Sequence, residues 1–180
     1  MKKISNVFAG MAILIFSLSF ETLKDWYLFD ATDFSIEFPK KPNASNQNVS
    51  SAIGELKMDI FMYDASKDGD ANFVYGLITS EYPDSLINSE KTAILPTFFR
   101  NSVDGAVKNV QGKILSEKTI DINGFPGREV NIDYQNGVAI IKMRLYLVHN
   151  KMYVLQTITE TSKVNNADAI KFHDSFKLKK

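Results

Sequence analysis

The sequence predicts an α+β domain in which one mainly antiparallel sheet is flanked by helices. Three observations support this fold class. Several segments alternate apolar and polar residues with a period of two, which is typical of half-buried strands. Two other segments repeat apolar residues at steps of three and four, as amphipathic helices do. Asn136-Gly137 is a strong signal for a two-residue hairpin. The chain has 180 residues, of which 44% are hydrophobic and 23% charged, and this composition fits one globular domain.

Residues 1–19 have the pattern of a cleaved export signal. Two lysines near the start precede an apolar stretch from Val7 to Phe16, and the small residues Ser17 and Ser19 are placed for a signal peptidase. The alternative is an uncleaved anchor, but the uncharged segment is shorter than the ~20 apolar residues that a spanning helix needs. We therefore expect cleavage, export to the periplasm or the extracellular space, no membrane span in the mature protein, and a single domain over residues 20–180.

The N-terminal half predicts strands joined by polar loops. In FSIEF, residues 34–38, three apolar side chains share one face. ELKMDIFMYD (residues 55–64) and NFVYGLITSEYP (residues 72–83) should form a hairpin across an acidic loop. The polar run PNASNQNVSS, residues 42–51, is interpreted as a surface loop between strands.

Two helices are expected. Pro96 suits the first turn of a helix, where its missing N–H costs nothing, and the helix should end at Gly112. Its apolar stripe comprises Phe99, Val103, Ala106, Val107 and Val110. The second helix lies near the end of the chain and follows Asn165 and Asn166, either of which can cap it.

Four strands should form a meander between the helices, from GKILSEKTIDI to KMYVLQTITE. A turn at Asn136-Gly137 sets the register of the central hairpin by counting. The expected pairs are Tyr134 with Ala139, Ile132 with Ile141 and Val130 with Met143 on one face, and Asn131 with Lys142 and Glu129 with Arg144 on the other. In INGFPGREV, residues 122–130, we expect two consecutive turns, at Asn123-Gly124 and at Pro126-Gly127, the second of type II.

Several classes of chemistry are poorly supported. The chain has no cysteine, which excludes thiol catalysis, disulfides and cysteine-ligated zinc. Lys+Arg and Asp+Glu are equal at 21 each, so nothing favours nucleic acid as a partner. No glycine-rich loop opens a helix and no G-x-S-x-G motif is present, so we expect neither a cofactor nor an enzyme. His149 should lie in a turn, and His173 on a helix surface or in a C-terminal turn, each without a catalytic partner.

Two candidate sites remain. The polar face of the meander places Glu129, Lys142, Arg144 and Tyr146 together, with Tyr153 opposite Tyr146, and these residues could line a ligand or partner site. The simpler interpretation, which we favour, is a cross-strand ion pair with aromatic cover beneath a helix.

The second candidate site is the acidic loop between the predicted strands of residues 55–64 and 72–83. It carries Asp64, Asp68, Asp70 and Asn72, whose oxygens are the ligands that calcium prefers. It lacks the full calcium-loop spacing, and acidic residues with glycine are also usual in a plain hairpin loop, so we expect no metal.

Four segments together resemble the exported bacterial members of the PsbP-like superfamily. They are FSIEFPKKP, GKILSEKTIDINGFPGREV, MRLYLVHNKMYVLQ and, at the terminal helix, FHDSFKL. The resemblance spans nearly the whole mature chain and implies an α/β/α sandwich around an antiparallel sheet. The best-known members of that superfamily, a non-enzymatic subunit of the photosynthetic oxygen-evolving complex and a nuclear-transport factor, both act by binding proteins. Nothing in this chain matches their partner-contacting segments residue by residue.

We therefore expect an exported, non-catalytic protein that binds or helps to assemble another envelope protein. The alternative is a small-molecule or ion carrier that uses the polar sheet face around Arg144. The two hypotheses differ in what the surface should show. A partner-binding protein should expose an apolar patch, whereas a carrier should have a concave pocket that encloses Arg144 and Tyr146.

Overall fold

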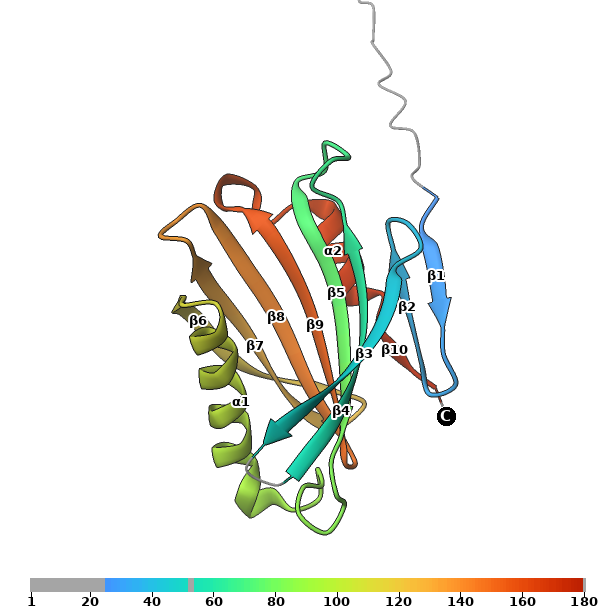
Figure 1. The fold of residues 1–180 in the computed structure, drawn as a ribbon, viewed down its shortest axis with the longest axis vertical. Coiled ribbons are helices and arrows are strands. Elements are labelled where there is room, and N and C mark those ends of the chain that lie inside the picture. The colour runs from blue at the N-terminus through green and yellow to red at the C-terminus, as the bar shows by residue number, and fades with distance from the viewer. Residues whose placement is uncertain (1–24, 52–53, 180) are drawn as a thin grey trace, which may run out of the picture.

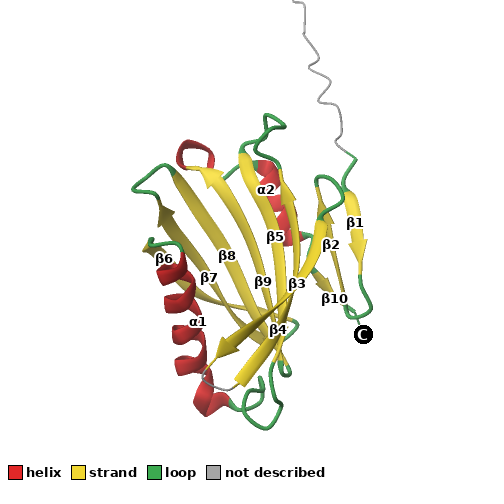
Figure 2. Ribbon diagram, viewed as in Figure 1, coloured by secondary structure: helices red, strands yellow, loops and turns green. Residues whose placement is uncertain are grey.

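The computed structural model describes residues 25–51 and 54–179, which form two antiparallel sheets and two α-helices (Figures 1 and 2). The larger sheet has seven strands in the order β3-β4-β5-β9-β8-β7-β6, and the smaller has the order β1-β2-β10. The strands are β1 (Tyr27–Asp30), β2 (Phe34–Phe38), β3 (Asn43–Ser51), β4 (Gly54–Asp64), β5 (Asn72–Glu81), β6 (Lys113–Ile122), β7 (Phe125–Tyr134), β8 (Ala139–Val148), β9 (Lys151–Glu160) and β10 (Lys177–Leu178). The helices are η1 (Thr92–Ile94), α1 (Leu95–Asn109), η2 (Thr161–Lys163) and α2 (Ala167–Asp174). The predicted α+β class is confirmed, but β1, β2 and β10 form a second sheet where one sheet was expected. The expected signal peptide lies outside the described residues.

The larger sheet has an apolar core on each face. On one face, Phe99 and Val103 of α1 pack with residues of β7, β8 and β9, among them Val130 and Met143. On the other face, Phe172 of α2 packs with β5, β9 and the small sheet. Figure 1 shows α1 and α2 on opposite sides of the large sheet. This division follows from the period of two along each strand, which sends alternate side chains to opposite faces.

The predicted meander is confirmed in its register. Val130 lies opposite Met143 and Glu129 opposite Arg144 across the hairpin of β7 and β8, as counting from Asn136-Gly137 predicted. Both predicted helices are present as well. Asn166 caps α2, because its side-chain oxygen accepts a hydrogen bond from the Ala169 backbone N–H at 2.8 Å.

The polar run that was interpreted as a loop is an edge strand. β3 pairs with β4 along its whole length, from Asn43 opposite Met62 to Ser51 opposite Gly54. β3 ends the strand order of the sheet, so only β4 lies beside it. An edge strand with most of its surface in water can carry polar side chains on both faces. The polar composition of residues 42–51 therefore reflects the exposure of this strand to water and does not indicate a loop.

The turn predicted at Pro126-Gly127 is also wrong. The chain reverses at Asn123 and Gly124, whose φ angles are 53° and 85°, and Pro126 and Gly127 already belong to β7. Gly127 is required for a different reason. A Cβ atom at Gly127 would lie 2.5 Å from the backbone oxygen of Leu145 and 2.7 Å from the ring of Tyr146, so only glycine fits against β8.

Candidate functional site

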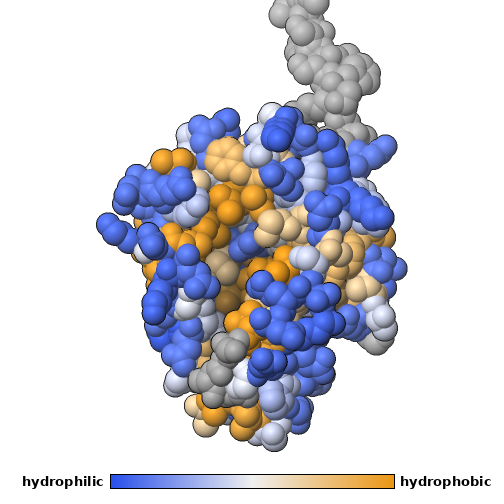
Figure 3. Space-filling model, in the orientation of Figure 1, coloured by the Kyte–Doolittle hydropathy of each residue, from blue (hydrophilic) through white to orange (hydrophobic). Residues whose placement is uncertain are grey.

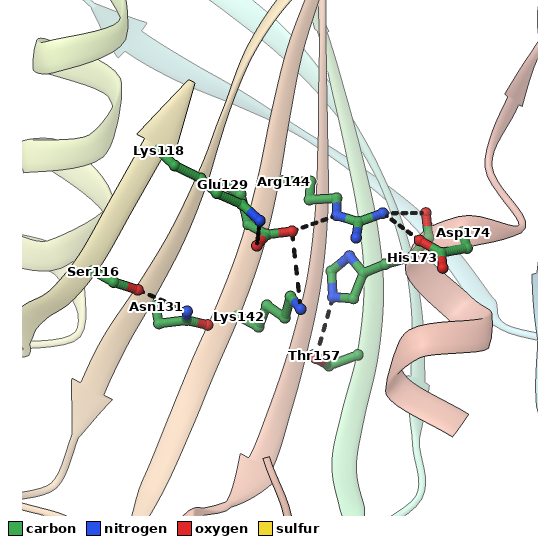
Figure 4. Close-up of polar contacts among 9 residues, drawn as sticks. All are labelled: Ser116, Lys118, Glu129, Asn131, Lys142, Arg144, Thr157, His173 and Asp174. Atoms are coloured by element: carbon green, nitrogen blue, oxygen red, sulfur yellow. Dashed lines mark hydrogen bonds and ion pairs between the residues drawn. The ribbon is translucent and has the colours of Figure 1, made fainter. Parts of the chain in front are cut away.

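Glu129 is the centre of a charged cluster on the sheet face that α2 covers (Figure 4). Arg144 Nε donates to Glu129 Oε2 at 2.7 Å, Lys118 Nζ lies 2.9 Å from Oε1, and Lys142 Nζ lies 3.9 Å from Oε2. Burial alone would raise the pKa of Glu129, but hydrogen bonds from Lys118 and Arg144 and the charge of Lys142 lower the pKa to about 2. Glu129 is therefore ionised and bound to protein cations. We call these residues, with Asp174, the Glu129 cluster.

Arg144 joins the sheet to α2. Its Nη1 donates to the Asp174 carboxylate at 2.7 Å and to the backbone oxygen of His173 at 3.1 Å, while its Nε holds Glu129. The guanidinium donates hydrogen bonds to two carboxylates and to a helix carbonyl, and these bonds connect the large sheet to α2. This geometry matches the cross-strand ion pair favoured from the sequence.

Tyr146 and Tyr153 lie beside the cluster but belong to the aromatic core. They face each other across β8 and β9, as predicted. Tyr146 stacks on Phe176, with ring centroids 6.0 Å apart, and Tyr153 donates its hydroxyl to Asp33 at 2.5 Å. Burial, together with the hydrogen bond to Asp33, raises the pKa of Tyr153. The structure thus brings together the five residues of the first candidate site: Glu129, Lys142, Arg144, Tyr146 and Tyr153. The polar contacts described for them all join one protein group to another.

His173 lies in the last turn of α2, one of the two positions expected, but it is buried and not exposed on the helix surface. Only 2% of the residue is exposed, its Nε2 lies 3.3 Å from Thr157 Oγ1, and its Nδ1 has no hydrogen-bond partner among the described residues. Burial, with the nearby charges of Arg144 and Lys142, lowers the pKa of His173 to about 3. The imidazole is therefore neutral at pH 7. A signal for this burial exists in the sequence, because His173 stands four residues after Ala169 on the inward face of α2.

In the acidic loop between β4 and β5, the carboxylates of Asp64 and Asp70 accept hydrogen bonds from groups of the loop and of β5. Asp64 accepts a hydrogen bond from the Ser66 backbone N–H, and Asp70 accepts bonds from Asn72 and from the Tyr75 hydroxyl. The Asp68 carboxylate binds Lys40 at 2.9 Å and also accepts a bond from Tyr63. Within residues 25–51 and 54–179, no group of three or more His, Cys, Asp or Glu side chains could hold a metal ion.

The opposite sheet face is apolar and only partly covered. α1 lies over β7 and β8, and no helix from residues 25–51 or 54–179 covers the face that β4, β5 and β9 form beside it. Two rows of side chains cross this bare part. One row contains Met62, Gly76 and Gln156, and the next contains Ile60, Ile78 and Val154. Figure 3 shows hydrophobic side chains gathered in a hollow between α1 and the edge formed by β3 and β4.

Two cavities follow this hollow. One has a volume of about 340 Å³ and the other about 670 Å³, and they adjoin at Tyr82, Asn101 and Ser102, which line both. Neither is lined by an Asp, Glu, Lys, Arg or His side chain, although 23% of the chain is charged. We call this surface the apolar groove. Its main apolar side chains are Leu56, Met58, Ile78, Leu86, Phe98 and Val154.

Gln156 is a polar residue on the floor of the apolar groove. Its side chain lies over Gly76, where a Cβ atom would be 3.1 Å from Gln156 Cγ. Among the described residues, the Gln156 amide has no hydrogen-bond partner. The amide is therefore available to a bound molecule at a point where the surrounding floor is apolar.

Sequence reasoning missed the apolar groove, although a signal for it was present. The period of two in ELKMDIFMYD puts Leu56, Met58, Ile60 and Met62 on one face of a strand, but neither predicted helix was assigned to cover that face. Seven strands at a spacing of ~4.8 Å span about 30 Å, whereas a helix with its side chains is ~10–12 Å wide. One helix on this face therefore had to leave part of the sheet bare.

Two further cavities have mixed or acidic linings. A cavity of about 720 Å³ lies where the β6–β7 and β8–β9 turns meet, and it is lined by Phe125, His149, Lys151 and Asp33 among others. A cavity of about 300 Å³ lies beside the acidic loop. Arg144 and Tyr146 line none of the four cavities described here.

No helix in the part of the chain that the structure describes is long and apolar enough to cross a membrane.

Comparison with known proteins supports the fold. No protein-family model matches the chain, and no curated protein matches it. The solution structure of cyanobacterial PsbP (CyanoP) from Synechocystis sp. PCC 6803 is similar, with a TM-score of 0.54 and 12% identity over 92% of this chain and 99% of that one. A Pseudomonas aeruginosa protein of unknown function, described as a putative regulator, gives a TM-score of 0.34 at 10% identity over 77% of this chain and 85% of its own. The chain thus has a PsbP-like fold.

Proposed function

We propose that this chain is an exported, non-catalytic binding protein of the PsbP-like superfamily, and that it holds another protein of the cell envelope in the apolar groove. The N-terminal pattern of the sequence supports export to the periplasm or the extracellular space. The similarity to cyanobacterial PsbP supports the superfamily and its α/β/α sandwich arrangement. The apolar groove is the observation that carries the binding role.

A contiguous apolar surface of this kind has an energetic cost in a protein that has no partner. Water-exposed apolar area is unfavourable by roughly 25 cal/mol per Å², so monomeric proteins rarely keep a large concave apolar surface bare. The floor side chains Ile60, Ile78 and Val154 are half-buried. Their remaining surface would leave water when a partner binds.

The carrier alternative lacks a comparable observation. Arg144 is bonded to Glu129 and Asp174, and it lines none of the four cavities described above. The polar sheet face around Arg144 therefore holds α2 in place, and the uncharged groove that favours a protein partner is on the other side of the sheet.

Affinity capture of the mature protein from its own cell envelope, followed by mass spectrometry, tests the proposal. The informative variant is Ile78→Lys, which puts a charge on the floor of the apolar groove. The matched control is Ile170→Lys, because Ile170 is 46% exposed and belongs to α2, on the opposite side of the sheet. We expect the same envelope protein to be captured by the wild type and by Ile170→Lys, and at least tenfold less of it by Ile78→Lys. Equal capture by both variants would overturn the proposed role of the groove.

A further inference from the structure

We infer that the occupant of the apolar groove is an amphipathic α-helix of the partner, which lies on β4, β5 and β9 beside α1. This inference rests on the proposed function and adds the structural class of the bound segment. Three properties of the groove lead to it: the state of the backbone on its floor, its openness to water, and the side chains along its helical wall.

The floor of the groove offers no backbone hydrogen bonds. β5 pairs with β4 on one side and with β9 on the other, and β9 also pairs with β8, so the N–H and C=O groups of the floor strands are used within the sheet. A bound segment must therefore satisfy its own backbone groups. An extended peptide could do so only at a sheet edge, whereas a helix does so internally.

The groove is open along one side. Floor residues such as Met58, Ile78 and Val154 remain half-buried, so a bound molecule would contact the floor with one face and keep the other in water. A fatty acyl chain, which is apolar on all sides, would leave much of its surface exposed there. An amphipathic helix has the matching division, with an apolar stripe for the floor and a polar face for the solvent.

The wall formed by α1 is suited to close packing of a second helix. Toward the cavity of about 340 Å³ it presents the small or uncharged residues Asn101, Ser102, Gly105, Ala106 and Asn109, whereas Thr97 and the bulky Phe98 line the adjoining cavity. A Cβ atom at Gly105 would meet no atom within 4 Å, so space is open above this position. Small residues allow helix axes to approach closely. With no charge on the wall or floor, the buried stripe of the occupant should be uncharged, and one polar side chain on it can bond to the Gln156 amide.

The probe is an 18-residue peptide with leucines at helical spacing and equal numbers of Lys and Glu on its other face. A peptide of the same composition in scrambled order is its control. Titration into the isotope-labelled mature protein, followed by NMR, should shift the side-chain amide of Gln156, and the scrambled peptide should bind at least tenfold more weakly. Gly105→Glu should weaken peptide binding at least tenfold because it fills and charges the wall, whereas Gly105→Ala should bind as the wild type does. Both substitutions replace a mid-helix glycine and should leave the protein folded, which circular dichroism checks.

Three outcomes would overturn the inference. The first is equal binding of the two peptides. The second is a shift of the Gln156 amide by palmitate or by phosphatidylglycerol vesicles but not by the helical peptide, which would assign the groove to a lipid. The third is a shift of that amide with protein concentration alone, which would assign it to a second copy of this chain. If the helical peptide does not bind but capture of the envelope protein still depends on Ile78, the partner binds through another structure and the proposed function stands. If capture is also independent of Ile78, both the helical occupant and the proposed function are overturned.

Discussion

Replacing Glu129 with glutamine should lower the free energy of unfolding by about 3 kcal/mol. The Glu129 side chain is 8% exposed, and it is the shared counter-ion of Lys118, Lys142 and Arg144. Glutamine keeps the shape but removes the charge, which leaves the half-buried Lys142 and Arg144 cations close together. Asp174 still balances Arg144, but Lys142 loses its ion pair with Glu129. Urea denaturation at pH 7 measures the effect.

Lys118 provides the matched control for this variant. Its side chain is 65% exposed although it lies 2.9 Å from the same carboxylate. Exposed ion pairs contribute less than about 1 kcal/mol, so Lys118→Gln should have a small effect. A Glu129→Gln variant that is no less stable than Lys118→Gln would show that the cluster does not hold α2 on the sheet.

The stability of the protein should fall as the pH drops below 6.5, because His173 is buried in its neutral form. Its pKa is about 3 in the folded protein and 6.5 for an unperturbed histidine, so the unfolded chain binds more protons in this range. Stability is therefore complete above pH 6.5 and is lost progressively toward pH 3. At pH 5 the loss is about 2 kcal/mol. Glu129, with its pKa lowered from 4.5 to about 2, adds a loss of the same sign only below pH 4.5.

Urea denaturation at pH 7 and pH 5 separates the two groups. His173→Gln removes the titrating imidazole and should make the difference in stability between these pH values smaller by about 2 kcal/mol, whatever its effect at pH 7. His149 is exposed in a turn, so His149→Gln is the control and should keep the wild-type difference. An unchanged difference in His173→Gln would contradict the buried, neutral histidine.

The sequence was most informative where a local rule fixes geometry. The Asn136-Gly137 turn determines which residues face each other along the whole β7–β8 hairpin, because a slip of one residue would exchange the two faces. The pairing of Glu129 with Arg144, and hence most of the polar candidate site, followed from that count. Asn166 was one of two proposed caps for α2 because asparagine is favoured at that position.

The errors arose where the decisive contact is distant in the sequence. Gly127 is a glycine because β8 passes close to it, and no local turn pattern contains that information. His173 is buried because the face of α2 that carries it meets Thr157 and Arg144 of the sheet. The bare half of the sheet depends on how α1 is positioned across seven strands, which the apolar pattern of each strand alone does not specify.

The most direct test of the binding role is photo-crosslinking in living cells from a single position in the apolar groove. A photoreactive side chain at Val154, on the floor beside Ile78, should form a crosslink to one envelope protein. The same group at Val138, which is 57% exposed in the β7–β8 turn, should not form it. Added Ile78→Lys should remove the Val154 crosslink. Crosslinks to the same protein from both positions, or none from Val154 while the protein remains folded and exported, would contradict the account.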